Sequence, residues 1–275
     1  MNTLTTTAPQ QGNATAWHDA RVGKFTASTI GKLMTPPRMT KELQARADAG
    51  EVFFGDTALQ LIAVKACERL GDVTDATAST RSMDRGTILE HAAIHLLGRK
   101  WKAIDHATFM PLGHNAGATP DGLTEGGAAT VDIKCPESFA DLLRFDLEVK
   151  DGDFASLEAW DRGYAWQIMT QAKAAGVRAA WLVYFTDRLP LIPLTEDERD
   201  EVQAIMDWHL ERRNEEKEYP WHYAFASNGF AFAAKRFTLT DELSERIDRT
   251  LAAAEVELAN MLTRTTINRN TTPTT

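Results

Sequence analysis

Residues 117–136, GATPDGLTEGGAATVDIKCP, decide the fold that the sequence predicts. Turn residues in GATPDGL are followed by the Gly-rich loop TEGGA and then by ATVDIK, which alternates in polarity until Pro136 stops it. This order predicts a strand end, a turn and a second strand, and therefore a β-hairpin. We place the other elements by their order relative to it.

Acidic and basic side chains fall on one face of this hairpin. Side chains two residues apart on a strand share a face, so Asp132 and Lys134 point one way while Val131 and Ile133 point into the packing. Asp121 lies on the turn at the mouth of the hairpin. Two carboxylates and an ammonium there suit metal-dependent phosphodiester cleavage, which needs oxygen ligands for Mg²⁺ and a cation beside the phosphate. A surface hairpin with an ordinary ion pair is an equally open interpretation.

Three further blocks accompany the hairpin: WHDARVGKFTAS at residues 17–28, GTILEHAAIHLLG at 86–98 and YAWQIMTQAKAAG at 164–176. With Pro120-Asp121 and Asp132-Ile133-Lys134, the chain resembles the PD-(D/E)xK nucleases. The Cys135-Pro136 that follows resembles their phage lambda exonuclease, or YqaJ-type viral recombinase, branch. The resemblance spans residues 17 to about 185 and leaves the last third of the chain outside it.

Length and composition are those of an ordinary globular protein: 275 residues, 43% hydrophobic and 25% charged. There is no apolar run of about 20 residues that could span a bilayer, and residues 1–16 lack the features of a secretory signal. The cytoplasm is the expected location, and the resemblance implies that of a bacterial host. Two cysteines, Cys67 and Cys135, are too few for a disulfide framework, so both are expected in the core.

Charge is unevenly distributed. The net charge of −9 argues against a protein that coats DNA by bulk attraction, so a DNA site must be local. Residues 17–50 carry six Lys or Arg against three acids, whereas residues 196–218 carry ten acids against four bases. We interpret the acidic run as the solvated face of a helix, with an acidic partner site as the alternative.

The N-terminal block predicts an anion site. Residues 1–15 are polar and expected to be disordered, and TASTIGKLM then predicts a short helix capped by Thr26 or Ser28. With Arg21 nearby, the natural ligand is a phosphate. The resemblance assigns Arg21 and Ser28 to the 5′-terminal phosphate of DNA and makes Trp17 a DNA-facing aromatic; a plain helix cap with a surface Arg stays open. Further on, Arg38 and Lys41 lie on a polar arm that could touch the duplex.

Two helices follow the arm. Residues 56–71 predict a packing helix through an apolar set at near-helical spacing, namely Leu59, Ile62, Val64, Cys67 and Leu70. DRGTILEHAAIHLLG predicts a second helix ending at Gly98. Its Glu90 is an acid in an apolar run, and the resemblance places it in the metal site. His91 and His95 are interpreted as partnered or surface histidines rather than zinc ligands, because no HExxH pattern is present.

Two positions differ from the pattern of the family. Thr119, two residues before Asp121, stands where the family has Ser, and the resemblance assigns it to the terminal phosphate. Asp132 stands where close relatives have Glu, and its shorter side chain must bring a metal nearer the strand. Residues 101–123 predict two strands leading into the hairpin.

The segment after Pro136 predicts a crossover helix, a helix ending at Gly176 and a buried apolar strand RAAWLVYFTD. Tyr164 and Gln167 are three residues apart and share a helical face. The resemblance assigns both to the site, Tyr164 as a DNA contact and Gln167 as a residue that orients the attacking water or a phosphate; partnered polar groups are the plainer alternative.

The C-terminal third predicts packing elements. Thr195 and Glu198 form a capping box that opens the acidic helix. Residues 219–237 are aromatic-rich and predict a packing hairpin through Asn228-Gly229, or alternatively a partner contact. A last helix from about 240 to 262 precedes a disordered tail at 263–275. We therefore expect one nuclease domain over 16–262, with a core at about 84–187 and a helical extension at 195–262.

The resemblance implies an α/β fold, a restriction-endonuclease-like core with a central mixed sheet flanked by helices. It further implies a Mg²⁺-dependent 5′-to-3′ exonuclease on linear duplex DNA ends, with Mn²⁺ as a substitute metal, for phage-type recombination by single-strand annealing. The resemblance also implies a single-strand annealing protein as a partner and a homotrimeric ring as the oligomeric state. A restriction-like or repair endonuclease, and a catalytically silent DNA-end-binding module, are the alternatives.

Overall fold

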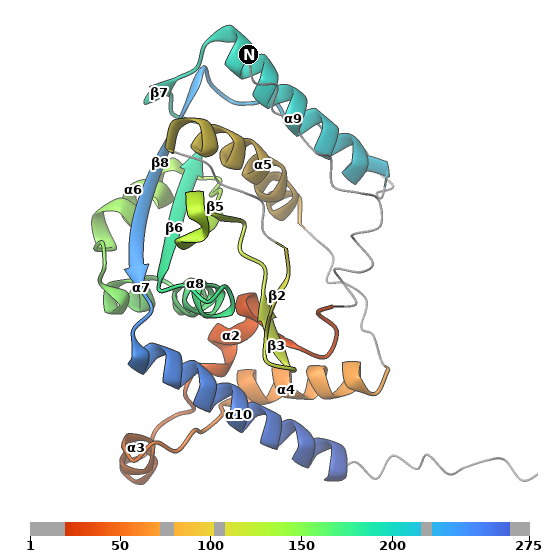
Figure 1. Ribbon diagram of the computed structural model, residues 1–275, viewed down its shortest axis with the longest axis vertical. Helices are drawn as coiled ribbons and strands as arrows, with labels where there is room; N and C mark the ends of the chain where they lie inside the picture. The colour runs from red at the N-terminus through yellow and green to blue at the C-terminus, as the bar shows by residue number, and fades with distance from the viewer. Residues whose placement is uncertain (1–19, 72–79, 102–107, 216–221, 265–275) are drawn as a thin grey trace, which may run out of the picture.

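The computed structural model describes residues 20–71, 80–101, 108–215 and 222–264 (Figure 1). Its helices are α2 (Ala27–Leu33), α3 (Lys41–Asp48), α4 (Asp56–Arg69), α5 (Arg81–Trp101), α6 (Phe139–Glu148), α7 (Phe154–Trp160), α8 (Arg162–Ala174), α9 (Glu196–Glu215) and α10 (Asp241–Arg264). Its strands are β1 (Phe25–Thr26), β2 (Met110–Leu112), β3 (Ala116–Ala118), β4 (Gly122–Leu123), β5 (Ala129–Lys134), β6 (Ala179–Thr186), β7 (Ile192–Pro193) and β8 (Gly229–Thr238). The expected disordered residues 1–15 lie outside these ranges.

A mixed sheet with the strand order β4-β5-β6-β8-β7 forms the centre of the molecule. The predicted hairpin is confirmed: β4 pairs antiparallel with β5 through Gly122 and Val131, with a 3₁₀ turn at Glu125–Gly127 between them. β5 and β6 are parallel from Ala129 and Ala179 onward, so their carboxyl ends lie at the same edge of the sheet. The α/β fold class with a central mixed sheet is therefore confirmed.

The prediction for the aromatic segment near the C-terminus is wrong. No hairpin turns at Asn228-Gly229; instead β8 runs as one strand from Gly229, and its residues 231–238 pair antiparallel with β6. Phe230 and Phe237 are fully buried, and this burial holds the strand inside the sheet. The expected C-terminal helical extension therefore also supplies a central strand.

A second, smaller sheet has the strand order β1-β3-β2. The two strands expected before the hairpin are present as β2 and β3, but they belong to this sheet and not to the central one. β1 pairs parallel with β3, matching Phe25 with Ala116. This pairing places Phe25 and Thr26 next to Ala116 and Gly117, which shortly precede Asp121 in the chain.

The two faces of the central sheet have separate cores. On one face, Val131 and Ile133 of β5 pack with α5 and α9. The opposite face packs against α8, which is covered by α2 and α10, and α4 packs against both of these helices (Figure 1). Since alternate residues of β5 face opposite sides, Asp132 points toward α8, as the alternation predicts.

Helix α2 crosses α8 at two glycines. A Cβ atom added to Gly31 would lie 2.7 Å from the Cα atom of Gly163, so position 31 has no room for a larger side chain. α8 begins at Arg162, where the Asp161 carboxylate accepts a hydrogen bond from the Tyr164 N–H at 2.8 Å, and it ends before Gly176 in a left-handed conformation with φ of 69°. This close crossing brings the start of α2 next to the polar face of α8.

Several sequence expectations about helices need correction. α5 continues through Gly98 to Trp101, so the predicted helix end at Gly98 is wrong; Gly98 is not among the glycines with positive φ, the conformation that commonly ends a helix. α4 buries Ala58, Leu61, Ile62 and Ala66 against its neighbours, so its buried face is rotated from the predicted one. Cys67 is consequently exposed and Leu70 is 43% exposed; the expectation of a core position for Cys67 is wrong. Cys135 is half-buried.

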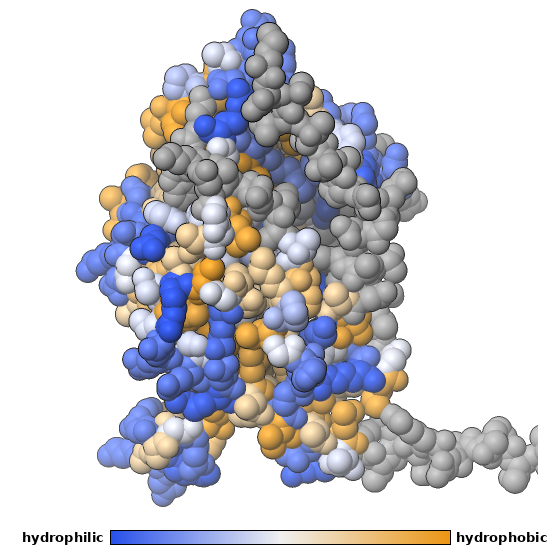
Figure 2. All heavy atoms as spheres, viewed as in Figure 1, coloured by the Kyte–Doolittle hydropathy of each residue, from blue (hydrophilic) through white to orange (hydrophobic). Residues whose placement is uncertain are grey.

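Two surface helices are strongly hydrophilic, and Figure 2 shows them at opposite ends of the visible face. α3 buries none of its residues, as expected of an arm. α9 buries only Val202, Met206 and Leu210 along one side, so its acids lie on the solvated face, and the Thr195–Glu198 capping box is confirmed at 3.0 and 3.2 Å.

Within the described ranges, no helix is both long and apolar enough to cross a membrane. α10 extends to Arg264, two residues into the expected tail, and the rest of that tail lies outside the described residues.

Candidate active site

The site forms where the hairpin opens. β4 pairs with β5 at Val131 and Thr130, and among the described residues no strand pairs with this edge of β5 beyond them. The side chain of Asp121, directly before β4, binds the backbone at this edge: its Oδ2 accepts a hydrogen bond from the Ile133 N–H at 2.6 Å. A carboxylate is thereby fixed at the carboxyl end of the parallel pair β5 and β6, the part of an open α/β sheet where ligands commonly bind.

Asp132 is the most buried member of the site. Its side chain is 0% exposed, and its Oδ1 accepts hydrogen bonds from the side-chain amides of Gln167 at 2.7 Å and Gln171 at 2.8 Å. Its Oδ2 lies 2.7 Å from the ammonium of Lys134. Gln171 was not among the residues predicted from the sequence, although it stands one helical turn after Gln167 on the same face and could have been found by that spacing.

Lys134 is a permanent cation in this setting. Burial by itself would lower the pKa of Lys134, but the charges of Asp132 and Asp121 outweigh burial and raise it. Its ammonium also lies over the ring of Tyr164, 4.7 Å from the centroid. Because the ammonium keeps its proton at neutral pH, Lys134 is suited to stabilise negative charge rather than to act as a base.

Burial, together with the charges of neighbouring carboxylates, raises the pKa of Glu90 and of Asp121. Burial raises the pKa of Glu90 to about 7, with Lys134 opposing the shift and Asp132 adding to it. Burial also raises the pKa of Asp121 well above its usual range, and the charges of Asp132 and Glu90 add to this. Glu90 comes from α5 on one face of the sheet and Gln167 from α8 on the other, so the two faces meet at the open edge of β5.

The residues fit a divalent cation of the Mg²⁺ type. Asp121, Asp132 and Glu90 supply hard oxygen atoms whose mutual repulsion a cation would relieve. In the described part of the chain, no group of three or more His, Cys, Asp or Glu side chains is arranged to hold a metal as it stands. Mg²⁺ usually needs only one or two protein carboxylates, together with water and substrate phosphates. The donor set therefore fits the ion without a preformed cage.

A cavity of about 510 Å³ lies next to these carboxylates. Glu90, Asp121 and Gln167 line it together with the three residues assigned to the terminal phosphate, Arg21, Ser28 and Thr119. Arg21 donates to the Thr119 hydroxyl at 3.5 Å, across 98 positions of sequence, and burial lowers the pKa of Arg21. The structure thus brings together all the assigned residues of the metal and phosphate sites.

Lys134 lines a second cavity, of about 420 Å³. Aromatic side chains line it, namely Trp160, Tyr164 and Tyr184, together with Arg144. Tyr164 therefore faces this cavity and Gln167 faces the first one, although both come from the same helical turn of α8.

The remaining candidate residues lie elsewhere. Trp17 is outside the described residues, and Arg38 and Lys41 are exposed on the arm, where they line neither cavity. His91 stacks on His209 of α9 with ring centroids 3.4 Å apart, and His95 lies 3.4 Å from a carboxylate oxygen of Glu201. Both histidines thus have partners on α9, as expected.

No family model matches the sequence, and no curated protein matches it. Solved structures do match. The chain is 21% identical to an alkaline exonuclease (LHK-Exo) from Laribacter hongkongensis, with a TM-score of 0.58, 90% of this chain and 94% of that chain being covered. A structure of LHK-Exo in complex with dAMP gives the same identity and coverage and a TM-score of 0.57.

A phage-related exonuclease from Haemophilus somnus 129PT is 18% identical, with a TM-score of 0.58, 87% of this chain and 95% of that chain being covered. These alignments extend over nearly the whole of both chains. The chain therefore has the fold of these exonucleases, including the C-terminal third that the sequence resemblance left out.

Proposed function

We propose that this protein is a Mg²⁺-dependent deoxyribonuclease, a 5′-to-3′ exonuclease acting on linear duplex DNA ends, built on the restriction-endonuclease-like PD-(D/E)xK core. The observation that carries the proposal is the set of side chains at the open edge of β5. Asp121, Asp132, Glu90, Lys134 and Gln167 converge there from both faces of the sheet. The exonuclease fold of the structural neighbours supports the same reaction class.

Each side chain of the site has its own role in the proposed reaction. Asp121 and Asp132, with Glu90, would hold Mg²⁺ or a substituting Mn²⁺, which would polarise the scissile phosphate and lower the pKa of the attacking water. Gln167 and Gln171 fix the orientation of Asp132 by binding the same carboxylate oxygen. Lys134, kept protonated by its neighbours, offsets the negative charge that grows on the phosphate in the transition state.

Recognition of a DNA end would come from the first cavity. Arg21, Ser28 and Thr119 present a guanidinium and two hydroxyls beside the carboxylates. A guanidinium is well suited to grip a terminal phosphate through two parallel hydrogen bonds. A 5′-phosphate held there would set the first phosphodiester bond over Asp121 and Asp132, and the enzyme would remove nucleotides from that end.

The test is incubation of end-labelled linear duplex with Mg²⁺, comparing 5′-phosphate with 5′-hydroxyl ends. We expect release of nucleotides from the 5′-ended strand, faster with the phosphate, and no release after chelation of the metal. Cleavage of closed circular DNA would favour a restriction-like or repair endonuclease. Binding of ends without any cleavage by the unmutated protein would leave only a DNA-end-binding module.

We further propose that the protein acts as a homotrimeric ring. A protomer of net charge −9 has little nonspecific attraction for DNA, and a ring would place the basic residues of 17–50 from each copy around one channel. Digestion that persists after excess unlabelled DNA is added, together with a trimeric mass by light scattering, is the expected result. A mass near 30.5 kDa, with digestion stopping at once, would contradict it.

A role in phage-type recombination follows from such an activity. Resection of 5′ ends leaves single strands that an annealing protein could pair, and this would take place in the cytoplasm of a bacterial host. Copurification of this chain with a single-strand annealing protein encoded by the same phage or prophage would test the partnership.

A further inference from the structure

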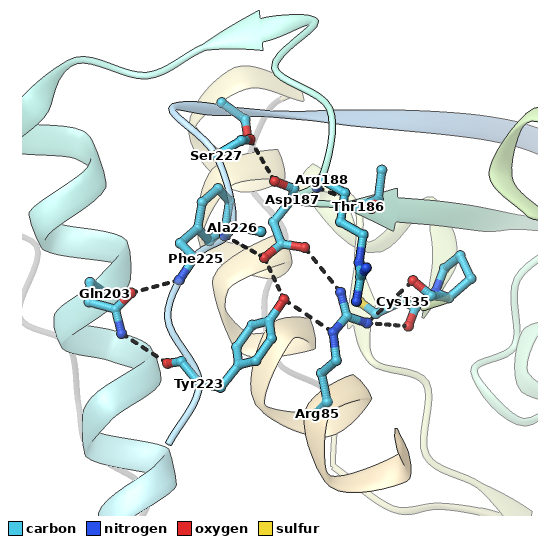
Figure 3. Close-up of polar contacts among 12 residues, drawn as sticks. Arg85, Cys135, Thr186, Asp187, Arg188, Gln203, Tyr223, Phe225, Ala226 and Ser227 are labelled. Atoms are coloured by element: carbon cyan, nitrogen blue, oxygen red, sulfur yellow. Dashed lines mark hydrogen bonds and ion pairs between the residues drawn. The ribbon is translucent and has the colours of Figure 1, made fainter. Parts of the chain in front are cut away.

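A buried polar network lies directly behind the candidate active site, centred on Arg85 of α5 (Figure 3). Its guanidinium donates hydrogen bonds to the Asp187 carboxylate at 3.0 Å, to the Tyr223 hydroxyl at 3.1 Å, and to the carbonyl oxygens of Cys135 and Pro136 at 3.2 and 3.3 Å. Figure 3 shows the guanidinium between Asp187 and Tyr223 on one side and the chain at Cys135 on the other. None of the five residues was singled out by sequence pattern for this role.

The network is a fully partnered ion pair. The side chains of Arg85 and Asp187 are 6% and 0% exposed. The Asp187 carboxylate also accepts hydrogen bonds from the Tyr223 hydroxyl and from the Ala226 N–H at 2.9 Å. Some buried side-chain nitrogen and oxygen atoms elsewhere in the described ranges lack a hydrogen-bond partner, but none of them belongs to this network. Removing one partner of such a pair leaves an uncompensated buried charge.

The contacts of Arg85 begin where the strand ladder of β5 ends. The last residue of β5 paired with β6 is Lys134, opposite Tyr184. The next two carbonyl groups, those of Cys135 and Pro136, are the ones that the guanidinium binds. Pro136 has no N–H to donate, so its own main chain can be held only through its carbonyl group. Arg85 therefore holds the main chain that carries the proposed catalytic lysine.

The same network connects three other parts of the molecule to that turn. Asp187 directly follows β6, and Tyr223 belongs to the segment between α9 and β8. Gln203 of α9 binds the Tyr223 carbonyl at 3.2 Å and the Phe225 N–H at 2.9 Å. Arg85 also stands on α5 five residues before Glu90, about 7.5 Å along the helix axis. A single guanidinium thus fixes the position of β5 relative to α5, and with it Lys134 relative to Glu90.

We propose that Arg85, supported by Asp187 and Tyr223, is a positioning residue for the reaction. It holds the end of β5 against α5 so that Lys134 and Glu90 meet at the scissile phosphate, while itself touching no substrate. This inference rests on the proposed nuclease function. It also assigns a functional role to the segment after α9, whose Tyr223 completes the support of the catalytic strand.

The test compares Arg85→Lys, Arg85→Ala and Tyr223→Phe with a matched control, Asp84→Asn. Asp84 is the neighbour of Arg85 on α5 and is equally buried, but it pairs with Arg213 of α9 at 2.9 Å and not with β5. Each variant is measured for thermal stability, for kcat and KM on 5′-phosphorylated duplex, and for amide hydrogen exchange in residues 129–138. The lysine substitution keeps the charge but cannot reproduce the planar fork.

Loss of a residue that orients active-site groups typically costs about 10–100-fold in activity. We expect that drop in kcat for Arg85→Ala, a smaller one for Arg85→Lys and Tyr223→Phe, KM within about twofold of the unmutated protein, and faster exchange at the end of β5. Guanidinium ion at millimolar concentration should restore part of the kcat of Arg85→Ala. Asp84→Asn should lose stability yet keep its kcat and the slow exchange of β5.

Three results would overturn the inference. One is unchanged kcat in folded Arg85→Lys and Tyr223→Phe; another is an equal loss of kcat in Asp84→Asn at matched stability. The third is unchanged exchange at residues 129–138 in all Arg85 variants, a readout that needs no nuclease activity. Absence of cleavage by the unmutated protein would instead refute the proposed function, and the exchange measurement would still decide whether Arg85 holds the strand.

Discussion

Replacing Lys134 with alanine separates the electrostatic role of the site from its structural role. The substitution removes the cation 2.7 Å from the fully buried Asp132 carboxylate. Breaking a buried pair costs about 3–5 kcal/mol; since Asp132 keeps two amide donors, we expect about 3 kcal/mol, the lower end of that range. For a domain of this size that corresponds to a fall of roughly 6–12 °C in melting temperature. Catalysis should suffer more, by about 10²–10³ in kcat, the usual effect of removing one group that stabilises transition-state charge.

The assay pairs thermal unfolding in chelator with single-turnover cleavage of a 5′-phosphorylated duplex in Mg²⁺. Adding Mg²⁺ should restore part of the lost stability, because a bound cation replaces the missing charge, while the rate stays low. Lys173→Ala is the matched control: Lys173 is 15% exposed and pairs with Asp248 at 3.0 Å, at the far end of α8. A Lys134→Ala rate near that of the unmutated protein would refute the active-site assignment.

Three further outcomes are expected. The pKa of Glu90 rises from its usual 4.5 to about 7 in the fold. With metal chelated, the free energy of unfolding should therefore fall by up to about 3 kcal/mol as pH rises from 4.5 to 7, and then level off. Thermal unfolding across that pH range should show a flatter slope for Glu90→Gln. Arg21→Ala should erase the preference for phosphorylated over hydroxyl 5′ ends while leaving some cleavage, and equal rates on both ends by the unmutated protein would contradict the phosphate assignment. Gly31→Ala should lower stability by about 1–3 kcal/mol through overpacking against Gly163, measured by urea unfolding, whereas Gly50→Ala, with open space around its Cβ but φ of 95°, tests backbone strain alone.

Local pattern was enough to predict much of the site. Alternation in ATVDIK placed Asp132 and Lys134 on one face, and the structure has their side chains 2.7 Å apart. A spacing of three placed Tyr164 and Gln167 on one helical face; both lie at the site, but they line different cavities. Such arrangements depend on the few residues around each position, and the period of the strand or helix fixes them. The hairpin and the capping box were predictable for the same reason.

What could not be predicted depends on contacts between distant parts of the chain. The position of β8 is set by pairing with β6, and nothing in the aromatic segment itself distinguishes a central strand from a hairpin. The partners of Arg85 are 50 to 138 positions away, so no spacing rule identifies them. Cys67 was misplaced because the buried side of α4 is chosen by the helices that pack on it, not by its own weak apolar pattern.

The position of β8 has a consequence for the order in which the protein can fold during its synthesis. Every residue of the candidate site lies before residue 172, but β6 gains its second neighbour only when β8 pairs Ala231 with Thr186 and Thr238 with Ala179. Until residue 238 has been made, β6 is an edge strand with unpaired backbone groups, open to pairing with other chains. Closing so long a loop is slow compared with forming the local hairpin. We therefore expect a nascent chain to complete its site late and to be most prone to aggregate while residues 187–228 are being made.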